Sequence, residues 1–235
     1  MYRIITYNVH SGVGTDKKQD YQRIGRFLAS SGADIVLLQE MDTRSPLRSV
    51  QQDVSDVTYH GEFTLVPSPT ITTDHGWYGN AILTKLSVSS FETIEISQEG
   101  REPRNAQVVT LRHNDKYITV INAHLGLKKW ERRAQISRIQ VYLANKLSAM
   151  SVPVILAGDF NEWQFFSGAF KKINTLLTKV STGRTFPSTF PFFSLDRVWV
   201  SKNLQIKQVI KHKSKPISLM SDHLPIQVTI DVKQK

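Results

Sequence analysis

Polar side chains that can bind a cation or move a proton follow several apolar, strand-like segments of the sequence. The first two segments are followed by Asn8 and by Glu40. Later segments are bordered in the same way by amides, imidazoles and carboxylates, namely Asn122, His124, Asp159, Asn161, Asp196, Asp222 and His223. Because α/β proteins place their chemistry at the ends of strands, this distribution predicts one polar site assembled from distant parts of the chain.

The types of these residues favour an oxygen-rich cation site. Proteins hold Mg²⁺ with one or two carboxylates, together with waters and substrate phosphate. The chain has no cysteine and no pair of histidines four residues apart on a helix, so a zinc site is less favoured. Taken singly, each Asn or Asp could be a turn former or a helix cap, and His10 and His124 could be core histidines. Their joint occurrence at successive strand ends favours the functional interpretation.

The elements that must position these residues are strands with apolar interiors. Eight are predicted: Arg3–Tyr7, Ile35–Leu38, Asn80–Leu83, Gln107–Leu111, Tyr117–Ile121, Val154–Ala157, Leu195–Val200 and Ile226–Val232. The segments Ile35–Leu38 and Val154–Ala157 are apolar throughout, which is typical of strands covered on both faces.

Three helices are predicted between the strands. The first follows Asp20, a plausible N-cap, and ends at Gly32. The other two carry apolar stripes at helical spacing, one over Ile136, Ile139, Leu143 and Leu147, and one over Phe166, Phe170, Ile173 and Leu177. These patterns favour a mixed-sheet α/β sandwich. Since no repeat or linker divides the chain, residues 1–235 are expected to form a single domain.

Composition limits the classes of partner and location. The 235 residues include 30 Lys and Arg against 20 Asp and Glu, a formal charge of +10. Such a charge favours polyanionic partners such as nucleic acid or anionic lipid headgroups, although scattered lysines also describe an ordinary solvated surface. The first residues alternate like a strand and lack the apolar core of a signal peptide, and no transmembrane segment is evident. A cytoplasmic protein is therefore expected, and its oligomeric state is left open.

The strand-end motifs, taken in order, resemble the endonuclease/exonuclease/phosphatase family, the metal-dependent phosphoesterases that include DNase I-like nucleases. The matching segments are Thr6–His10, Leu38–Glu40, Gly79–Leu83, Asn122–Leu125, Gly158–Asn161, Leu195–Val200 and Ser221–Pro225. The resemblance implies a four-layer α-β-β-α sandwich of two packed mixed sheets flanked by helices. It also implies hydrolysis of a phosphate ester with Mg²⁺ or Mn²⁺.

The resemblance implies metal and base roles for five residues. Glu40 matches the principal metal carboxylate, and Asn8 is a ligand or holds metal-bound water. Asp222 is either a second metal ligand or a support for the loop that carries His223. His223 matches the final-motif histidine and Asp196 its carboxylate partner, and His223 either takes a proton from water or steadies the phosphate.

The remaining site residues are implied in the same way. Asp159 would orient or deprotonate the attacking water, Asn161 would donate a hydrogen bond to the pentacovalent phosphate, and His124 would contact the phosphate or assist the leaving group. Substrate contacts are expected from Arg104, Asn80 and Tyr78, with Arg101 an alternative to Arg104. The chain departs from the nuclease pattern at His10, where many members carry an acid or an amide, which makes a second metal on that side doubtful.

The substrate remains open at this stage. Charge and the aromatics Trp77, Tyr78 and Trp163 favour a nuclease-like enzyme that cleaves phosphodiester bonds. Other aromatics near the site, namely Phe165, Phe166, Phe190, Phe192 and Phe193, favour the alternative of a phospholipid-headgroup or small-molecule phosphodiesterase or phosphatase. A catalytically inert binding module is a third possibility, against which the completeness of the polar set argues.

Overall fold

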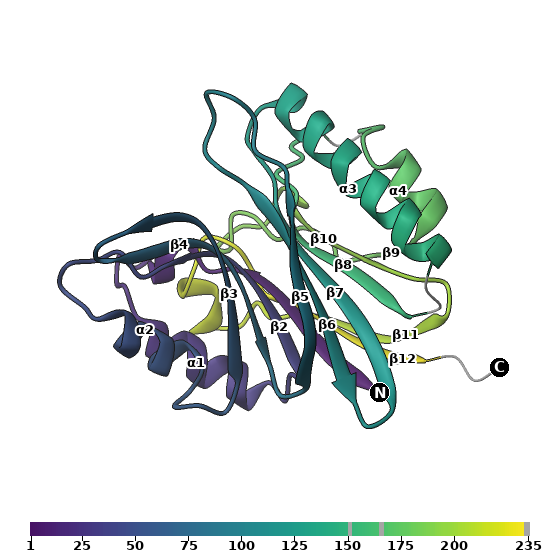
Figure 1. Cartoon of the computed structure of the whole chain (residues 1–235). Helices are drawn as coiled ribbons and strands as arrows, with labels where there is room; N and C mark the ends of the chain where they lie inside the picture. Colours follow the sequence, from purple (N-terminus) through teal and green to yellow (C-terminus); the bar gives the residue numbers. More distant parts are fainter. Residues whose placement is uncertain (150–151, 165–166, 233–235) are drawn as a thin grey trace.

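Two six-stranded sheets packed face to face form the centre of the protein in the computed structural model, which describes residues 1–149, 152–164 and 167–232 (Figure 1). The first sheet has the order β11 (Leu204–Lys211), β12 (Ile226–Val232), β1 (Tyr2–Asn8), β2 (Ile35–Asp42), β4 (Gly76–Thr84) and β3 (Thr64–Thr73). The second has the order β5 (Ser87–Glu95), β6 (Asn105–His113), β7 (Lys116–His124), β8 (Val154–Asp159), β10 (Asp196–Val200) and β9 (Thr178–Val180).

Each sheet contains one parallel pair of strands joined by a helix. In the first sheet β1 and β2 are parallel, and α1 (Tyr21–Ser30) connects them. In the second, β7 and β8 are parallel, and α3 (Lys129–Ala149) connects them. The other strand pairs are antiparallel, so both sheets are mixed. Parallel neighbours bring their carboxyl ends to the same edge, which is where Asn8, Glu40, His124 and Asp159 lie.

Three apolar layers hold the sandwich together. One lies between the sheets and contains Ile4 and Val198. A second packs α1 against the outer face of the first sheet, with Ile5 and Tyr7 of β1 facing the helix. A third packs α3 and α4 (Lys171–Leu176) against the second sheet. Figure 1 shows α1 and α2 (Val50–Val57) beside one sheet and α3 and α4 beside the other, which confirms the predicted four-layer arrangement.

The eight predicted strands are the eight interior strands of the two sheets. The four strands that were not predicted, β3, β5, β9 and β11, are the four edges. Edge strands keep one side of their backbone and much of their surface in water, so their sequences lack the apolar runs that mark the interior. In β5, eight of the nine residues are exposed. The helix α2 was also not predicted.

Two of the helix predictions are confirmed, α1 with its N-cap and α3 with its buried apolar stripe, and the third is corrected. Asp20 caps α1 by accepting a hydrogen bond from the backbone N–H of Arg23, and Gly32 follows with a φ of +69°. The third helix is shorter than its apolar stripe indicated, because Phe170 and Leu177 flank α4 rather than belong to it. Phe166 lies outside the described residues. Within the described ranges, no helix is both long and apolar enough to cross a bilayer.

Candidate active site

Glu40 leaves the first sheet at an irregularity in β2. The pairing of β2 with β4 shifts register between Leu38 and Met41, and Glu40 has a φ of +57°. A left-handed conformation is unfavourable for a residue with a side chain and occurs where the surrounding structure requires it, often at functional sites. The bulge places the Glu40 carboxylate at the site while leaving the side chain 22% exposed.

Asn8 joins the carboxylates of the two sheets. Its Nδ2 atom donates hydrogen bonds to Glu40 Oε1 over 2.9 Å and to Asp159 Oδ2 over 3.0 Å. Its Oδ1 atom accepts from the backbone N–H of His10 over 3.0 Å. The amide therefore offers its nitrogen to the carboxylates, and it fixes the distance between Glu40 on β2 and Asp159 on β8.

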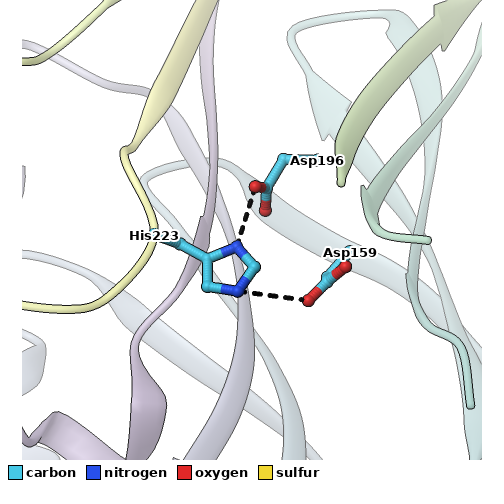
Figure 2. A group of neighbouring side chains, drawn as sticks. All are labelled: Asp159, Asp196 and His223. Atoms are coloured by element: carbon cyan, nitrogen blue, oxygen red, sulfur yellow. Dashed lines mark hydrogen bonds and ion pairs between the residues drawn. The ribbon is translucent and has the colours of Figure 1, made fainter. Parts of the chain in front are cut away.

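His223 and Asp196 form a buried pair (Figure 2). His223 Nδ1 lies 2.8 Å from Asp196 Oδ2, which also accepts a hydrogen bond from the Thr185 hydroxyl. His223 Nε2 lies 3.6 Å from Asp159 Oδ2. Burial alone would lower the pKa of His223, but the Asp196 and Asp159 carboxylates outweigh it and raise the pKa above its ordinary value. His223 is therefore an imidazolium at neutral pH.

The Asp159 carboxylate lies between the two sheets and contacts residues from both. Burial raises the pKa of Asp159, and the His223 imidazolium opposes part of that rise. Its Oδ1 atom accepts a hydrogen bond from the Asn161 backbone over 2.8 Å. Gly158 precedes it with a φ of +144°, and a Cβ at that position would lie 1.9 Å from the Ala123 carbonyl oxygen. The glycine allows β8 to pair with β7 so that Asp159 lies opposite His124.

His124 lies between Arg104 and Asn161. Arg104 Nη1 lies 2.7 Å from Nδ1, and Asn161 Nδ2 lies 3.2 Å from Nε2. Nε2 is also 3.6 Å from Glu40 Oε1 and 3.8 Å from Asp159 Oδ2. Burial, followed by the charges of Arg104 and His223, lowers the pKa of His124 well below its ordinary value. His124 is thus neutral where His223 is charged.

Two of the three predicted substrate contacts lie at this site. Tyr78 is buried, and burial together with Glu40 raises the pKa of its hydroxyl. Arg104 reaches both Tyr78 and His124, whereas Arg101 faces α3 with its Nε 3.6 Å from Glu131 Oε2. The third, Asn80, is buried and donates to the Asn105 carbonyl oxygen over 3.0 Å.

Asp222 precedes His223 directly, and its charge adds to those that raise the pKa of His223. Its Oδ1 atom is 3.8 Å from His10 Nδ1, and its backbone carbonyl accepts a hydrogen bond from Ser188 over 2.7 Å. The structure thus brings together Asn8, Glu40, His124, Asp159, Asn161, Asp196 and His223, and Asp222 contacts His10.

Comparison with known sequences identifies the family. Residues 5–223 match the profile of the endonuclease/exonuclease/phosphatase family, which covers nearly the whole chain and both ends of the site. The chain belongs to this family. It is also similar to the uncharacterized protein YbhP of Escherichia coli K12, with 27% identity over 97% of this chain and 96% of that protein.

Solved structures of the family share the DNase I-like fold. Mannosyl-6-phosphatase of Bacteroides thetaiotaomicron superimposes with a TM-score of 0.79 and 16% identity, covering 98% of this chain and 100% of that chain. The human nocturnin catalytic domain, solved with bound sulfate, superimposes with a TM-score of 0.77 and 18% identity, covering 99% and 93% of the two chains. At this identity the likeness concerns the fold.

Enzymes of this family generally use divalent metals, and the donor set here fits one. The ligand atoms of Asp159, Asp196 and His223 all lie within 4.8 Å of one another, but the His223–Asp196 hydrogen bond already occupies Nδ1. Glu40 is different, because it is partly exposed and its Oε2 atom forms no hydrogen bond within the described ranges. A solvent-facing carboxylate beside an asparagine suits a hard cation such as Mg²⁺ or Mn²⁺.

Asn122 was predicted at a strand end without a role of its own, and Gln39 and Phe186 were not predicted as parts of the site. Gln39 and Asn122 are fully buried behind it, and Gln39 Nε2 donates to Asn122 Oδ1 over 2.7 Å across the two sheets. Phe186 packs beside His223 with 4.9 Å between ring centroids, and Trp163 packs on Phe186. Gln39 and Asn122 stand at predicted strand ends, which was an available signal, whereas Thr185 and Phe186 lie in a loop whose sequence carries none.

Proposed function

We propose that this protein hydrolyses phosphate esters, with phosphodiesters preferred, by in-line attack of water assisted by Mg²⁺ or Mn²⁺. The observation that carries the proposal is the convergence on Asp159 Oδ2, which lies 3.0 Å from Asn8 Nδ2, 3.6 Å from His223 Nε2 and 3.8 Å from His124 Nε2. A carboxylate, an imidazolium and a neutral imidazole at one point supply a proton acceptor and two kinds of phosphate contact.

The protonation states assign the roles. Asp159 accepts the proton of the attacking water, since its raised pKa makes it a stronger base than an exposed aspartate. His223, held as an imidazolium by Asp196, stabilises the negative charge that grows on the phosphate oxygens. His124 and Asn161 bind the phosphate or the leaving oxygen, and Arg104 with Tyr78 extends that polar wall.

Glu40 holds the divalent cation in this proposal, and Asn8 fixes the Glu40 carboxylate. A bound cation supplies positive charge to a phosphoryl oxygen. Asp222 supports the loop that carries His223, an assignment favoured by its contact with His10 and by the Ser188 hydrogen bond to its carbonyl.

The substrate class follows from charge and from the relatives. A formal charge of +10 favours polyanions, so a nuclease-like activity is the first candidate. A small-molecule or lipid-headgroup phosphoesterase is the second candidate, and the similarity to a mannosyl-6-phosphatase supports it.

The test is hydrolysis of bis-p-nitrophenyl phosphate by the wild-type protein and by Glu40→Gln, with Mg²⁺, with Mn²⁺ and with EDTA. Metal-dependent turnover is expected, with a loss of at least about 10²-fold in Glu40→Gln. Glu99→Gln, a matched change at an exposed position, should keep wild-type activity. Absence of turnover with every divalent metal would reject hydrolysis and favour a binding module.

A substrate panel then separates the candidates. Plasmid DNA, RNA, phospholipid-headgroup diesters and sugar phosphomonoesters are compared at equal phosphate concentration. Preferential cleavage of DNA or RNA would support the nuclease-like candidate. Cleavage of only the lipid or sugar phosphates would replace it with the second candidate.

A further inference from the structure

A basic pocket lies beside the loop that carries His223. It has a volume of about 470 Å³, and its wall includes Arg184, Lys211, Lys213, Lys215, Ser188 and Ser218. None of its lining residues is acidic. The proposed hydrolysis of a phosphate ester assigns no role to these four cations.

The charges in the basic pocket are not compensated by the protein. Within the described ranges none of the four cations forms an ion pair with a carboxylate. Lys211 Nζ donates to the Arg184 carbonyl oxygen over 2.9 Å, which holds the ammonium at the wall. Burial, followed by the charges of Lys213 and Arg184, lowers the pKa of Lys211. An anion in the pocket would relieve this repulsion.

The wall of the basic pocket is hydrogen-bonded directly to the active-site loop. The Ser188 hydroxyl donates to the carbonyl oxygens of Ser218 and Ser221 over 2.8 and 2.7 Å, and its backbone N–H donates to Asp222. On the other side, Lys211 pairs with Ile226, three residues after His223. The basic pocket and the catalytic histidine therefore share one supporting segment.

The segment that carries Arg184 also connects the basic pocket with the His223–Asp196 pair. Thr185, the neighbour of Arg184, donates a hydrogen bond to Asp196, the partner of His223, and accepts one from the Leu224 backbone. Arg184 itself lies over the Phe192 ring, with 5.4 Å between Cζ and the ring centroid. The cation is therefore oriented by packing at the wall.

We propose that the basic pocket binds a second phosphate group, carried by the same substrate molecule whose reacting phosphate lies at His223. The inference deepens the proposed function and rests on it. A terminal phosphate has two negative charges and three acceptor oxygens, which match several ammonium and guanidinium donors better than a single carboxylate does. Because the pocket is concave and Lys211 is partly buried in its wall, a discrete group fits it better than a flat anionic surface.

The test is calorimetric binding of alkanediol bisphosphates of increasing chain length and of the matched monophosphates, in the presence of Mg²⁺. The wild-type protein is expected to bind the best bisphosphate at least about tenfold more tightly than its monophosphate. The advantage should disappear in Lys213→Glu/Lys215→Glu. It should persist in Lys116→Glu/Lys207→Glu, which makes the same change of charge at exposed positions outside the pocket.

Three results would overturn the proposal. The first is the absence of a bisphosphate advantage at every chain length, and the second is its persistence in the pocket variant. The third is an equal loss of the bisphosphate advantage in both double variants, since such a loss would reflect only the overall electrostatic field of the protein. Thermal unfolding of each variant confirms that all are folded, and exposed Lys213 and Lys215 leave the core untouched.

Binding to lipid vesicles tests whether the phosphate in the pocket belongs to a membrane lipid instead of the substrate. If phosphatidylglycerol vesicles, but not phosphatidylcholine vesicles, bind through Lys213 and Lys215 while no bisphosphate shows an advantage, the pocket serves a lipid surface and the proposal is wrong. Calorimetry does not depend on turnover. A bisphosphate advantage without hydrolysis of bis-p-nitrophenyl phosphate would therefore support the pocket and reject the proposed function.

Discussion

Arg104 Nη1 donates a hydrogen bond to Nδ1 of His124 over 2.7 Å. A guanidinium has no lone pair to accept a proton, so the Nδ1 lone pair must face it and the ring proton stays on Nε2. That proton is directed toward the side of the site occupied by Glu40 and Asp159. The relationship makes His124 a neutral donor within a few ångströms of the charged His223.

Replacing Arg104 with Met should remove the contact that fixes the tautomer of His124. We expect the pKa of His124 to rise toward its ordinary value, because one of the charges that lowers it is removed, and both ring tautomers to become populated. Nitrogen-resolved NMR of the histidine rings measures both quantities. Arg101→Met is the matched control, since Arg101 pairs with Glu131 and should leave the His124 signals unchanged. An unaltered His124 in Arg104→Met would contradict this role.

Asp196→Asn should lower the pKa of His223, because it removes the nearest negative charge from the imidazolium. Turnover should fall by about 10²- to 10⁴-fold, the range ascribed to losing a well-placed proton-transfer or charge-stabilising group. An NMR titration of His223 and a kcat measurement test the two parts together. Asp74→Asn, at an exposed turn, should change neither. A His223 pKa that is the same in Asp196→Asn as in the wild type would disprove the pairing.

The buried, neutral His124 should make stability fall in acid. Its pKa is lowered in the folded state, so the unfolded chain binds a proton that the folded chain does not once the pH falls below the ordinary histidine value. This contribution is absent above that value and grows as the pH falls below it, by at most roughly 1.4 kcal/mol per pH unit.

The effect is isolated by comparing wild type with His124→Asn. Urea unfolding with EDTA at neutral pH and at pH 5 gives the free energy of unfolding of both proteins. The acid-induced loss should be smaller in the variant, by at most roughly 1.4 kcal/mol for each pH unit below the ordinary histidine pKa. His223 contributes with the opposite sign, but equally in both proteins. Identical pH dependence of the two would show that His124 titrates normally.

Asn122→Ala should destabilise the protein by about 3 kcal/mol, because several buried groups lose their partners. The Asn122 amide donates to the carbonyls of Leu38 and Ala81 and accepts from Gln39. Chemical denaturation measures the loss. Gln208→Ala, on an exposed face of β11, should stay within about 0.5 kcal/mol of wild type. A loss no larger than that of Gln208→Ala would contradict the proposed bridge between the sheets.

The interior strands of both sheets could be predicted from the sequence, and the edge strands could not. The strand Ile226–Val232 was predicted with its observed bounds, because its alternation is marked by buried apolar residues. The strand β3 contains Pro67 and Pro69, which argue against a strand and are tolerated only at an edge. The polar strand β5 offers no apolar pattern at all.

The candidate site shows a similar limit. Side-chain type and position at strand ends were enough to group Glu40, Asp159 and His223, since parallel and antiparallel neighbours bring those ends together. The contact of Asp222 with His10 depends on a loop conformation, which no local pattern in the sequence specifies. The roles of Arg104 and Thr185 depend on contacts between segments distant along the chain.

The most direct test of the account is the position of a bound cation. Crystals of the protein soaked in Mn²⁺ give an anomalous signal that locates the ion without assumptions about the chemistry. The account predicts a peak within coordination distance of Glu40, roughly 2.0–2.6 Å, and its loss in Glu40→Gln. A peak held instead by Asp159, Asp196 and His223, with Glu40 turned away from it, would contradict the account.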